Sequence, residues 1–128
     1  MPTYHIDIAG LVAGADQKWV DNLISRFPVD GVERSTHGVS RRISTPAVRQ
    51  IVLARRLVTA LGVQVGAAVA LANGLLSSQD GSVSLRNGLE LRIDRNAFDA
   101  EIERALTDAV ERVVPARRGR PPRRRPDT

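Results

Sequence analysis

The side chains whose type and spacing most clearly suggest a binding function lie at the C-terminal end of the chain. The stretch Arg117–Arg125 holds six arginines, one glycine and two prolines. Residues 115–128 contain six arginines and one aspartate, which accounts for the whole net charge of +5 that the chain carries. Guanidinium groups bind phosphates and enter the negative minor groove of A·T-rich DNA. This distribution predicts double-stranded DNA as the partner of the tail.

The centre of this tail resembles the core of an AT-hook, and four residues carry the resemblance: Arg118, Gly119, Arg120 and Pro121. Glycine lacks the Cβ that would collide with the floor of the groove, and proline holds the backbone extended. The flanking arginines are expected on phosphates: Arg117, Arg123, Arg124 and Arg125. Four prolines and few apolar side chains predict that residues 115–128 are disordered without a partner. The alternative is a basic tail that only improves solubility.

A second group of candidate residues lies in QKWVDNLISRF, residues 17–27. Its apolar residues recur at helical spacing and define one buried face: Val20, Leu23, Ile24 and Phe27. The other face carries the residues that could meet DNA in the major groove: Gln17, Lys18, Asn22 and Arg26. Asparagine pairs with adenine in two hydrogen bonds, while lysine suits guanine or phosphate. The alternative is an ordinary solvated helix face.

Short signals on either side of this helix indicate how it is positioned. Residues 6–15 have the apolar spacing of a preceding short helix, Gly14 suits a tight turn, and Asp16 suits an N-cap. This order is typical of a helix-turn-helix. Residues 32–43 then suggest a hairpin, or wing, whose arginines are candidate phosphate contacts: Arg34, Arg41 and Arg42. The alternative for these arginines is a salt-bridged hairpin.

The rest of the chain predicts further helices and one more hairpin. Ser44 caps a third helix that stops near Gly62 and carries an apolar stripe: Ala47, Ile51, Ala54, Val58 and Leu61. A fourth helix spans about 65–72 and ends at Asn73-Gly74. Asn87-Gly88 lies between alternating apolar residues, which is a strong hairpin signal. A final helix over residues 96–114 ends before Pro115 and carries a narrow apolar stripe: Phe98, Ile102, Leu106, Ala109 and Val113. Such a stripe can dock on the hairpin or form a dimer or partner interface with a second chain.

The order of these elements resembles the MerR family of winged DNA-binding regulators over residues 4–72. The matching features are Tyr4 and Ile6 at the entry, the turn at Ala13–Asp16, the wing at Gly31–Ser44 and the helix ending at Ala54–Val65. The resemblance implies a winged helix-turn-helix that binds DNA. It does not extend to the metal-sensing chemistry of the family, because the chain contains no cysteine.

We therefore expect a mainly α fold with a small β wing: a winged helix-turn-helix, then a β-hairpin, a C-terminal helix and a disordered basic tail. The expected division is a DNA-binding domain over residues 1–76, a dimerisation or partner-binding unit over 77–114, and the tail over 115–128. The expected function is a dimeric, sequence-specific transcriptional regulator, more specifically a repressor. The alternatives are an antitoxin that binds a toxin through residues 80–114, and an architectural or excisionase-like DNA-binding protein.

Other classes of function find little support in the sequence. The two histidines, His5 and His37, lack metal-ligand spacing, and no glycine-rich phosphate loop follows a strand. We expect no enzymatic activity, no metal and no cofactor. The apolar runs are shorter than a membrane span, and the N-terminus lacks a secretory signal, so we expect a cytoplasmic, nucleoid-associated protein.

Overall fold

The computed structural model describes the backbone of residues 3–33 and 42–118, and the side chains of these residues up to residue 112. This part of the chain is mainly helical, with two small antiparallel sheets. The helices are α1 (Ile6–Ala13), α2 (Gln17–Arg26), α3 (Thr45–Leu61), α4 (Val65–Ser77) and α5 (Arg95–Arg118). The strands are β1 (Thr3–His5), β2 (Arg42–Ser44), β3 (Ser82–Ser84) and β4 (Glu90–Arg92). The predicted class, mainly α with small β elements, is confirmed.

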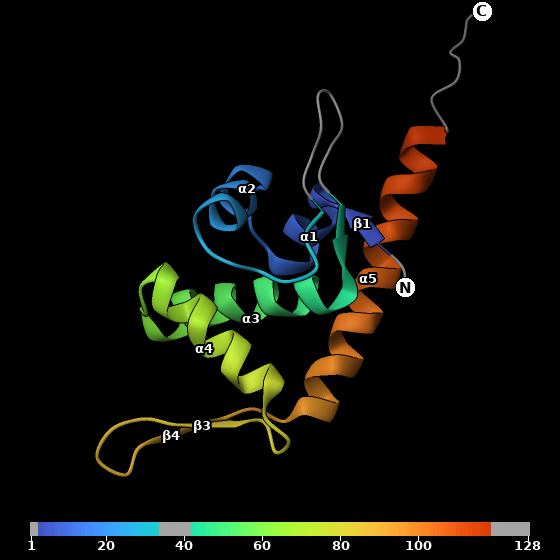
Figure 1. Cartoon of the computed structure of the whole chain (residues 1–128). Helices are drawn as coiled ribbons and strands as arrows, with labels where there is room; N and C mark the ends of the chain where they lie inside the picture. The colour runs from blue at the N-terminus through green and yellow to red at the C-terminus, as the bar shows by residue number, and fades with distance from the viewer. Residues whose placement is uncertain (1–2, 34–41, 119–128) are drawn as a thin grey trace, which may run out of the picture.

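The central helix α3 organises the core, and the other helices pack around it (Figure 1). Eight of its 17 residues are buried, including Ile51 and Ala54 on the predicted apolar stripe. The Ser44 hydroxyl accepts a hydrogen bond from the Ala47 N–H at 3.4 Å, and the helix ends at Gly62, whose φ is +69°. Both ends were predicted, because an N-cap serine and a left-handed glycine act within a single turn.

Helix α4 continues beyond its predicted end at Asn73-Gly74 and reaches Ser77. The reason is tertiary: Leu75 is fully buried in the core, and this burial offsets the weak helical propensity of glycine. Gly74 also lets strand β3 approach, since a Cβ at that position would lie 3.0 Å from Cγ2 of Val83. The glycine at which α4 was expected to end is therefore the position where α4 contacts strand β3.

The predicted hairpin is formed by β3 and β4, with Val83 opposite Leu91. Asn87 and Gly88 have φ values of +57° and +78°, as a type I′ turn requires at its two central positions. The Leu89 N–H donates to the Arg86 carbonyl at 3.1 Å and closes the turn. The base of the hairpin rests on α4, while its turn projects away from the helices (Figure 1).

Helix α5 packs on α1 and forms ion pairs with α3. Its apolar stripe is not a free surface for a second chain, which corrects a prediction: Phe98, Ile102, Leu106 and Ala109 are at most 7% exposed within this chain. The side chain of Val113, the fifth predicted interface residue, lies outside the described residues. One hydrophobic core includes residues of α1, α3 and α5, so it runs across the predicted boundary after residue 76.

The end of α5 also differs from the prediction, because the helix passes through Pro115 to Arg118. A proline in a helix interior lacks one N–H donor and crowds the carbonyl four residues earlier, so a helix end was expected there; the helix nevertheless continues for three more residues. Residues 115–118 are thus helical and not part of an irregular tail. Residues 119–128 lie outside the described residues.

Candidate nucleic-acid interface

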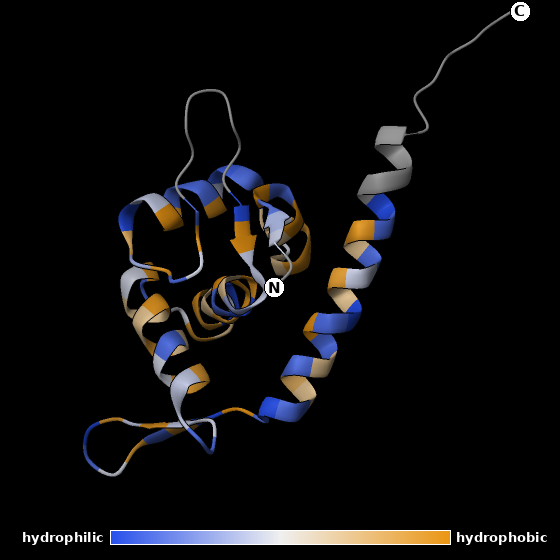
Figure 2. Ribbon diagram, turned by 45° about the vertical axis from the view of Figure 1, so that its right-hand side comes forward, coloured by the Kyte–Doolittle hydropathy of each residue, from blue (hydrophilic) through white to orange (hydrophobic). Residues whose placement is uncertain are grey.

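The outer face of α2 holds all four residues predicted to meet DNA from this helix. The side chains of Gln17, Lys18, Asn22 and Arg26 are exposed. The inner face is buried, with Val20 at 0% and Leu23 at 2% exposure. Figure 2 shows the outer surface of α2, at the top of the molecule, as hydrophilic. The helix is therefore fixed to the core along one side and presents polar groups along the other.

A tight turn sets the angle between α1 and α2. Gly14 adopts φ +70° at the end of α1, and the Ala15 N–H donates to the Gly10 carbonyl at 3.0 Å. These are the hydrogen bond and backbone conformation of a Schellman motif. Gly10 is required for packing, because a Cβ there would lie 2.9 Å from the Ala15 carbonyl oxygen. The predicted glycine turn is confirmed at Gly14, and Gly10 is an additional requirement.

The start of α2 is fixed by Asp16 and Trp19. The Asp16 carboxylate accepts a hydrogen bond from the Trp19 N–H at 2.8 Å, as the predicted N-cap requires. The guanidinium of Arg55, on α3, lies 4.9 Å from the centre of the Trp19 ring. This cation–π contact brings a third-helix arginine beside α2. Sequence reasoning did not identify Arg55, because no local pattern connects residues 36 positions apart.

The charges on the outer face of α2 are balanced. Lys18 and Arg26 supply two cations, and Asp16 and Asp21 supply two anions. A balanced face gives little net attraction to phosphate, so its value for recognition is in neutral hydrogen-bonding groups such as Asn22. Long-range attraction to DNA would have to come from cationic segments elsewhere in the chain.

The base of the predicted wing lies beside the N-terminal strand. Strand β2 pairs with β1, placing Tyr4 opposite Ile43, and Val32 bridges to Ile43 from the other side. The Glu33 N–H donates to the Arg42 carbonyl at 2.8 Å, and the Ser44 N–H donates to the Gly31 carbonyl at 2.9 Å. Two chain segments therefore leave this base side by side, as the hairpin prediction requires. Residues 34–41 lie outside the described residues, and the predicted contacts Arg34 and Arg41 lie among them.

Arg42 has a structural role in addition to the one predicted. Its guanidinium donates to the Thr3 hydroxyl at 3.2 Å and to the Thr3 carbonyl at 3.1 Å, and lies 2.9 Å from Nε2 of His5. These contacts join β2 to β1 and involve three of the five guanidinium N–H groups. The assignment of Arg42 as a phosphate contact stays a prediction that would depend on the other two.

The predicted minor-groove residues lie at and beyond the end of α5. Arg117 and Arg118 belong to the helix backbone, but their side chains are outside the described residues. The remaining predicted residues are wholly outside them: Gly119, Arg120, Pro121, Arg123, Arg124 and Arg125. Minor-groove and phosphate binding by this tail therefore stays a prediction from the sequence.

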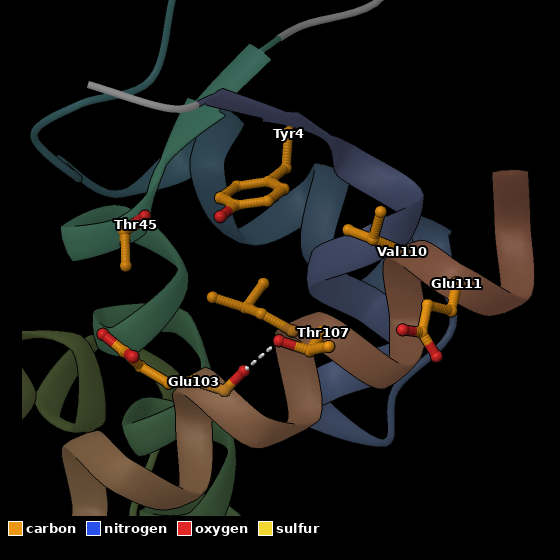
Figure 3. A pocket seen from close by; sticks show the side chains of 7 residues that line it. Tyr4, Thr45, Glu103, Thr107, Val110 and Glu111 are labelled. Atoms are coloured by element: carbon orange, nitrogen blue, oxygen red, sulfur yellow. Dashed lines mark hydrogen bonds between the residues drawn. The ribbon is translucent and has the colours of Figure 1, made fainter.

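A pocket of about 500 Å³ lies between β1, the start of α3, and α5 (Figure 3). Tyr4 and Thr45 line one side, and Leu106 and Val110 of α5 line the other. Glu103 and Glu111 stand at its edge, eight positions apart on α5, which is about 12 Å along a helix axis. This spacing is too wide for one metal ion or for a catalytic carboxylate pair.

Among the described residues, two carboxylates have lowered pKa values, and both accept hydrogen bonds from neighbouring side chains. Hydrogen bonds from the Ser82 and Ser78 hydroxyls lower the pKa of Asp80 below its ordinary 3.8. The hydrogen bonds from Arg56 lower the pKa of Glu101 below its ordinary 4.5. Both groups stay ionised at neutral pH, so neither is suited to general acid–base chemistry there. Over the described residues, no group of three or more potential metal ligands occurs.

Comparisons with known proteins give no assignment: no family model, curated protein or solved structure matches the chain. Among the described residues, none of the helices is both long and apolar enough to cross a membrane.

Proposed function

We propose that this chain is a sequence-specific DNA-binding protein that reads bases with the outer face of α2 and serves as a transcriptional regulator. The observation that carries the proposal is the arrangement of α2: a buried inner face, a tight turn from α1, and four exposed polar side chains on the outer face. A second helix held in this way is the element that helix-turn-helix proteins insert into the major groove.

The roles of the α2 residues follow from their chemistry. Asn22 lies one turn along the helix from Lys18, so both can reach base edges in one stretch of the groove. The Asn22 amide would pair with adenine, and Lys18 would meet guanine or a phosphate. Arg26, at the end of α2, would contact the phosphate backbone. Gln17 can donate to or accept from either kind of partner.

Because the charges of α2 are balanced, we assign the electrostatic attraction to DNA phosphates to the tail. Residues 115–128 hold the net positive charge of the chain, so they would supply most of the salt-sensitive affinity. An AT-hook-like insertion of Arg118 and Arg120 would add a preference for A·T-rich flanking DNA. Helix α2 would then recognise the bases, and the tail would supply most of the affinity for phosphates and the minor groove.

The antitoxin alternative relies on the acidic hairpin and helix of residues 80–114 as the contact for a basic partner. The apolar stripe of α5 is buried within this chain, but the acidic residues Glu103, Asp108 and Glu111 are exposed, so this alternative stays open. An architectural role uses the same DNA-binding surface, and a bending assay on the selected site would distinguish it from regulation.

The test is selection of a binding site from random duplexes, followed by fluorescence anisotropy with variants of the full chain. Asn22→Ala should weaken binding to the selected site by about 1–3 kcal/mol, or roughly 5- to 150-fold, without changing non-specific binding. The matched control is Asn73→Ala, because Asn73 is an exposed asparagine on α4. If both substitutions leave selective binding unchanged, α2 does not recognise the bases of the site.

Further variants separate the contribution of α2 to DNA binding from the contribution of the tail. Arg26→Ala should lower the slope of log affinity against log salt by about 1, while Arg104→Ala on the exposed face of α5 should not. Replacing Arg118 and Arg120 by alanine should remove any preference for A·T-rich flanks and leave the choice of site intact. A chain that shows no selection and no salt-dependent binding would refute the proposal.

A further inference from the structure

The β3–β4 hairpin exposes more apolar surface than any function described so far requires. Leu85 and Leu89, which flank its turn, are 44% and 64% exposed. An isolated two-stranded hairpin is marginally stable in water, and exposed leucines on it are a cost without a partner. Figure 2 shows this hairpin projecting from the base of the molecule, at the opposite end from α2. Covering the hairpin would therefore leave the candidate DNA-binding face open.

The base of the hairpin is firmly held, so its outer edge has a defined orientation. Asp80 accepts hydrogen bonds from the hydroxyls of Ser78 and Ser82 at 3.0 and 2.8 Å. Arg95 donates to the Ser78 carbonyl at 3.0 Å and connects the start of α5 to the end of α4. The Ile93 N–H donates to the Gly81 carbonyl at 2.8 Å. Both strands are anchored where they leave the body of the protein.

Strand β4 has an unpaired edge, since among the described residues it pairs only with β3. The Leu85 N–H bonds to the Leu89 carbonyl, and the Ile93 N–H bonds to the Gly81 carbonyl. Because hydrogen-bonded and non-hydrogen-bonded positions alternate, Leu89, Leu91 and Ile93 direct their backbone groups toward β3. Glu90 and Arg92 therefore direct their N–H and C=O groups outward. This edge is a template for another strand.

We propose that the outer edge of β4 binds β4 of a second copy of this chain, in an antiparallel pair with a two-fold axis at Leu91. Backbone alternation permits pairing only between outward-directed residues, so the axis could pass through Glu90, Leu91 or Arg92. An axis at Glu90 would oppose two glutamates, and one at Arg92 would oppose two arginines. An axis at Leu91 places Glu90 of each chain opposite Arg92 of the other. Only this register is electrostatically favourable.

The apolar residues agree with the same register. Side chains alternate between the faces of a strand, so Leu89, Leu91 and Ile93 share one face while Glu90 and Arg92 share the other. With the axis at Leu91, the two Leu91 side chains meet, and Leu89 of each chain lies opposite Ile93 of the other. The exposed Leu89 is then covered on both chains. The two hairpins become a four-stranded sheet with one continuous apolar face and ion pairs on the opposite face.

Within one chain, Arg92 already contacts Glu90 at 2.6 Å and Asp80 at 3.9 Å. These contacts show that the Glu90 and Arg92 side chains lie on the same face, as the register requires. A symmetric, self-complementary contact of this kind closes into a dimer and leaves no free edge for further assembly on β4. The segment Glu90-Leu91-Arg92 is its own complement, which identifies a second copy as the occupant.

The test is the oligomeric state of the full chain in the absence of DNA, measured by sedimentation at several protein concentrations. The wild-type chain should form dimers. E90R and R92E should each weaken dimerisation roughly tenfold or more, because each substitution opposes like charges at two symmetry-related positions. The charge reversal R86E is the matched control, since Arg86 lies in the hairpin turn outside the paired segment, and it should leave the dimer intact.

Mixing the two variants distinguishes a broken interface from a damaged fold. An E90R chain and an R92E chain carry opposite charges at both paired positions, so their equimolar mixture should form heterodimers. The double variant E90R/R92E should form homodimers again. A wild-type chain that stays monomeric at high micromolar concentration, or a mixture that stays monomeric, would refute the proposal. Because no DNA is present, this failure would leave the proposed function of α2 untouched, and the converse also holds.

Discussion

Replacing Ile102 by alanine tests where the apolar stripe of α5 is buried. Ile102 is 0% exposed and belongs to the same core as the buried residues of α1 and α3. The substitution removes three side-chain carbons. At about 0.8 kcal/mol for each buried methylene, the lost transfer free energy is about 2.4 kcal/mol, and the cavity adds to it. We expect the free energy of unfolding to fall by about 3–4 kcal/mol.

The assay is chemical and thermal denaturation of the wild-type and I102A chains, each at a low and a high protein concentration. In a chain of this size, a loss of 3–4 kcal/mol would lower the Tm by roughly 12–16 °C. The loss should be the same at both concentrations, because the contacts of Ile102 are within its own chain. Asp108→Ala, on the exposed side of the same helix, should change stability by less than about 0.5 kcal/mol.

A different result is expected if Ile102 is buried between two chains and not within one. If Ile102 lay in an interface between chains, I102A would weaken self-association and leave the unfolding of the monomer unchanged. A stability loss that appears only at high protein concentration would therefore show that α5 exchanges partners between chains. A loss below about 1 kcal/mol at both concentrations would show that α5 is not part of the core.

Two further predictions concern single side chains. Arg42→Ala should lower the free energy of unfolding by about 1–3 kcal/mol, because the guanidinium bonds to β1 are lost; a salt-dependence slope of DNA binding reduced by about 1 would show a phosphate contact as well, and an unchanged slope would exclude it. Arg42→Lys should recover little of the stability, because a lysine cannot reproduce the geometry of the guanidinium. Glu101→Gln should cost less than about 1 kcal/mol at pH 7, since the Arg56–Glu101 pair is about half exposed. Arg56 lowers the pKa of Glu101, so the stability from this pair is complete above the ordinary pKa of 4.5 and is lost as the pH falls through the folded-state value. The wild-type and E101Q chains should therefore converge in denaturation experiments at acidic pH, and a difference that persists there would exclude the ion pair as its cause.

Much of the local structure followed from short patterns. Asp16 and Ser44 cap helices as predicted, and Gly14 and Gly62 end them in the left-handed region. Asn87-Gly88 forms the predicted turn. Each of these signals acts on backbone groups within about four residues, so the nearby sequence contains all the information required.

Features that depend on distant contacts could not be predicted from the local sequence. The bonds from Arg42 to strand β1 are one example, since its partners Thr3 and His5 lie 37 to 39 residues away. The helix break expected at Gly74 is overridden because the adjacent Leu75 is fully buried in the core. In each case the deciding contact comes from a distant part of the chain.

The sequence by itself determined the approximate positions of the helices, the turn at Asn87-Gly88 and the polar face of α2, because periodicity, caps and turns are local properties. Only the tertiary structure decided which apolar surface is covered. It buries the stripe of α5 in the core of the same chain and leaves Leu85 and Leu89 of the hairpin exposed. The amphipathic pattern of a segment shows that one face needs a partner, but it does not identify that partner. That choice depends on how all the elements pack together at once.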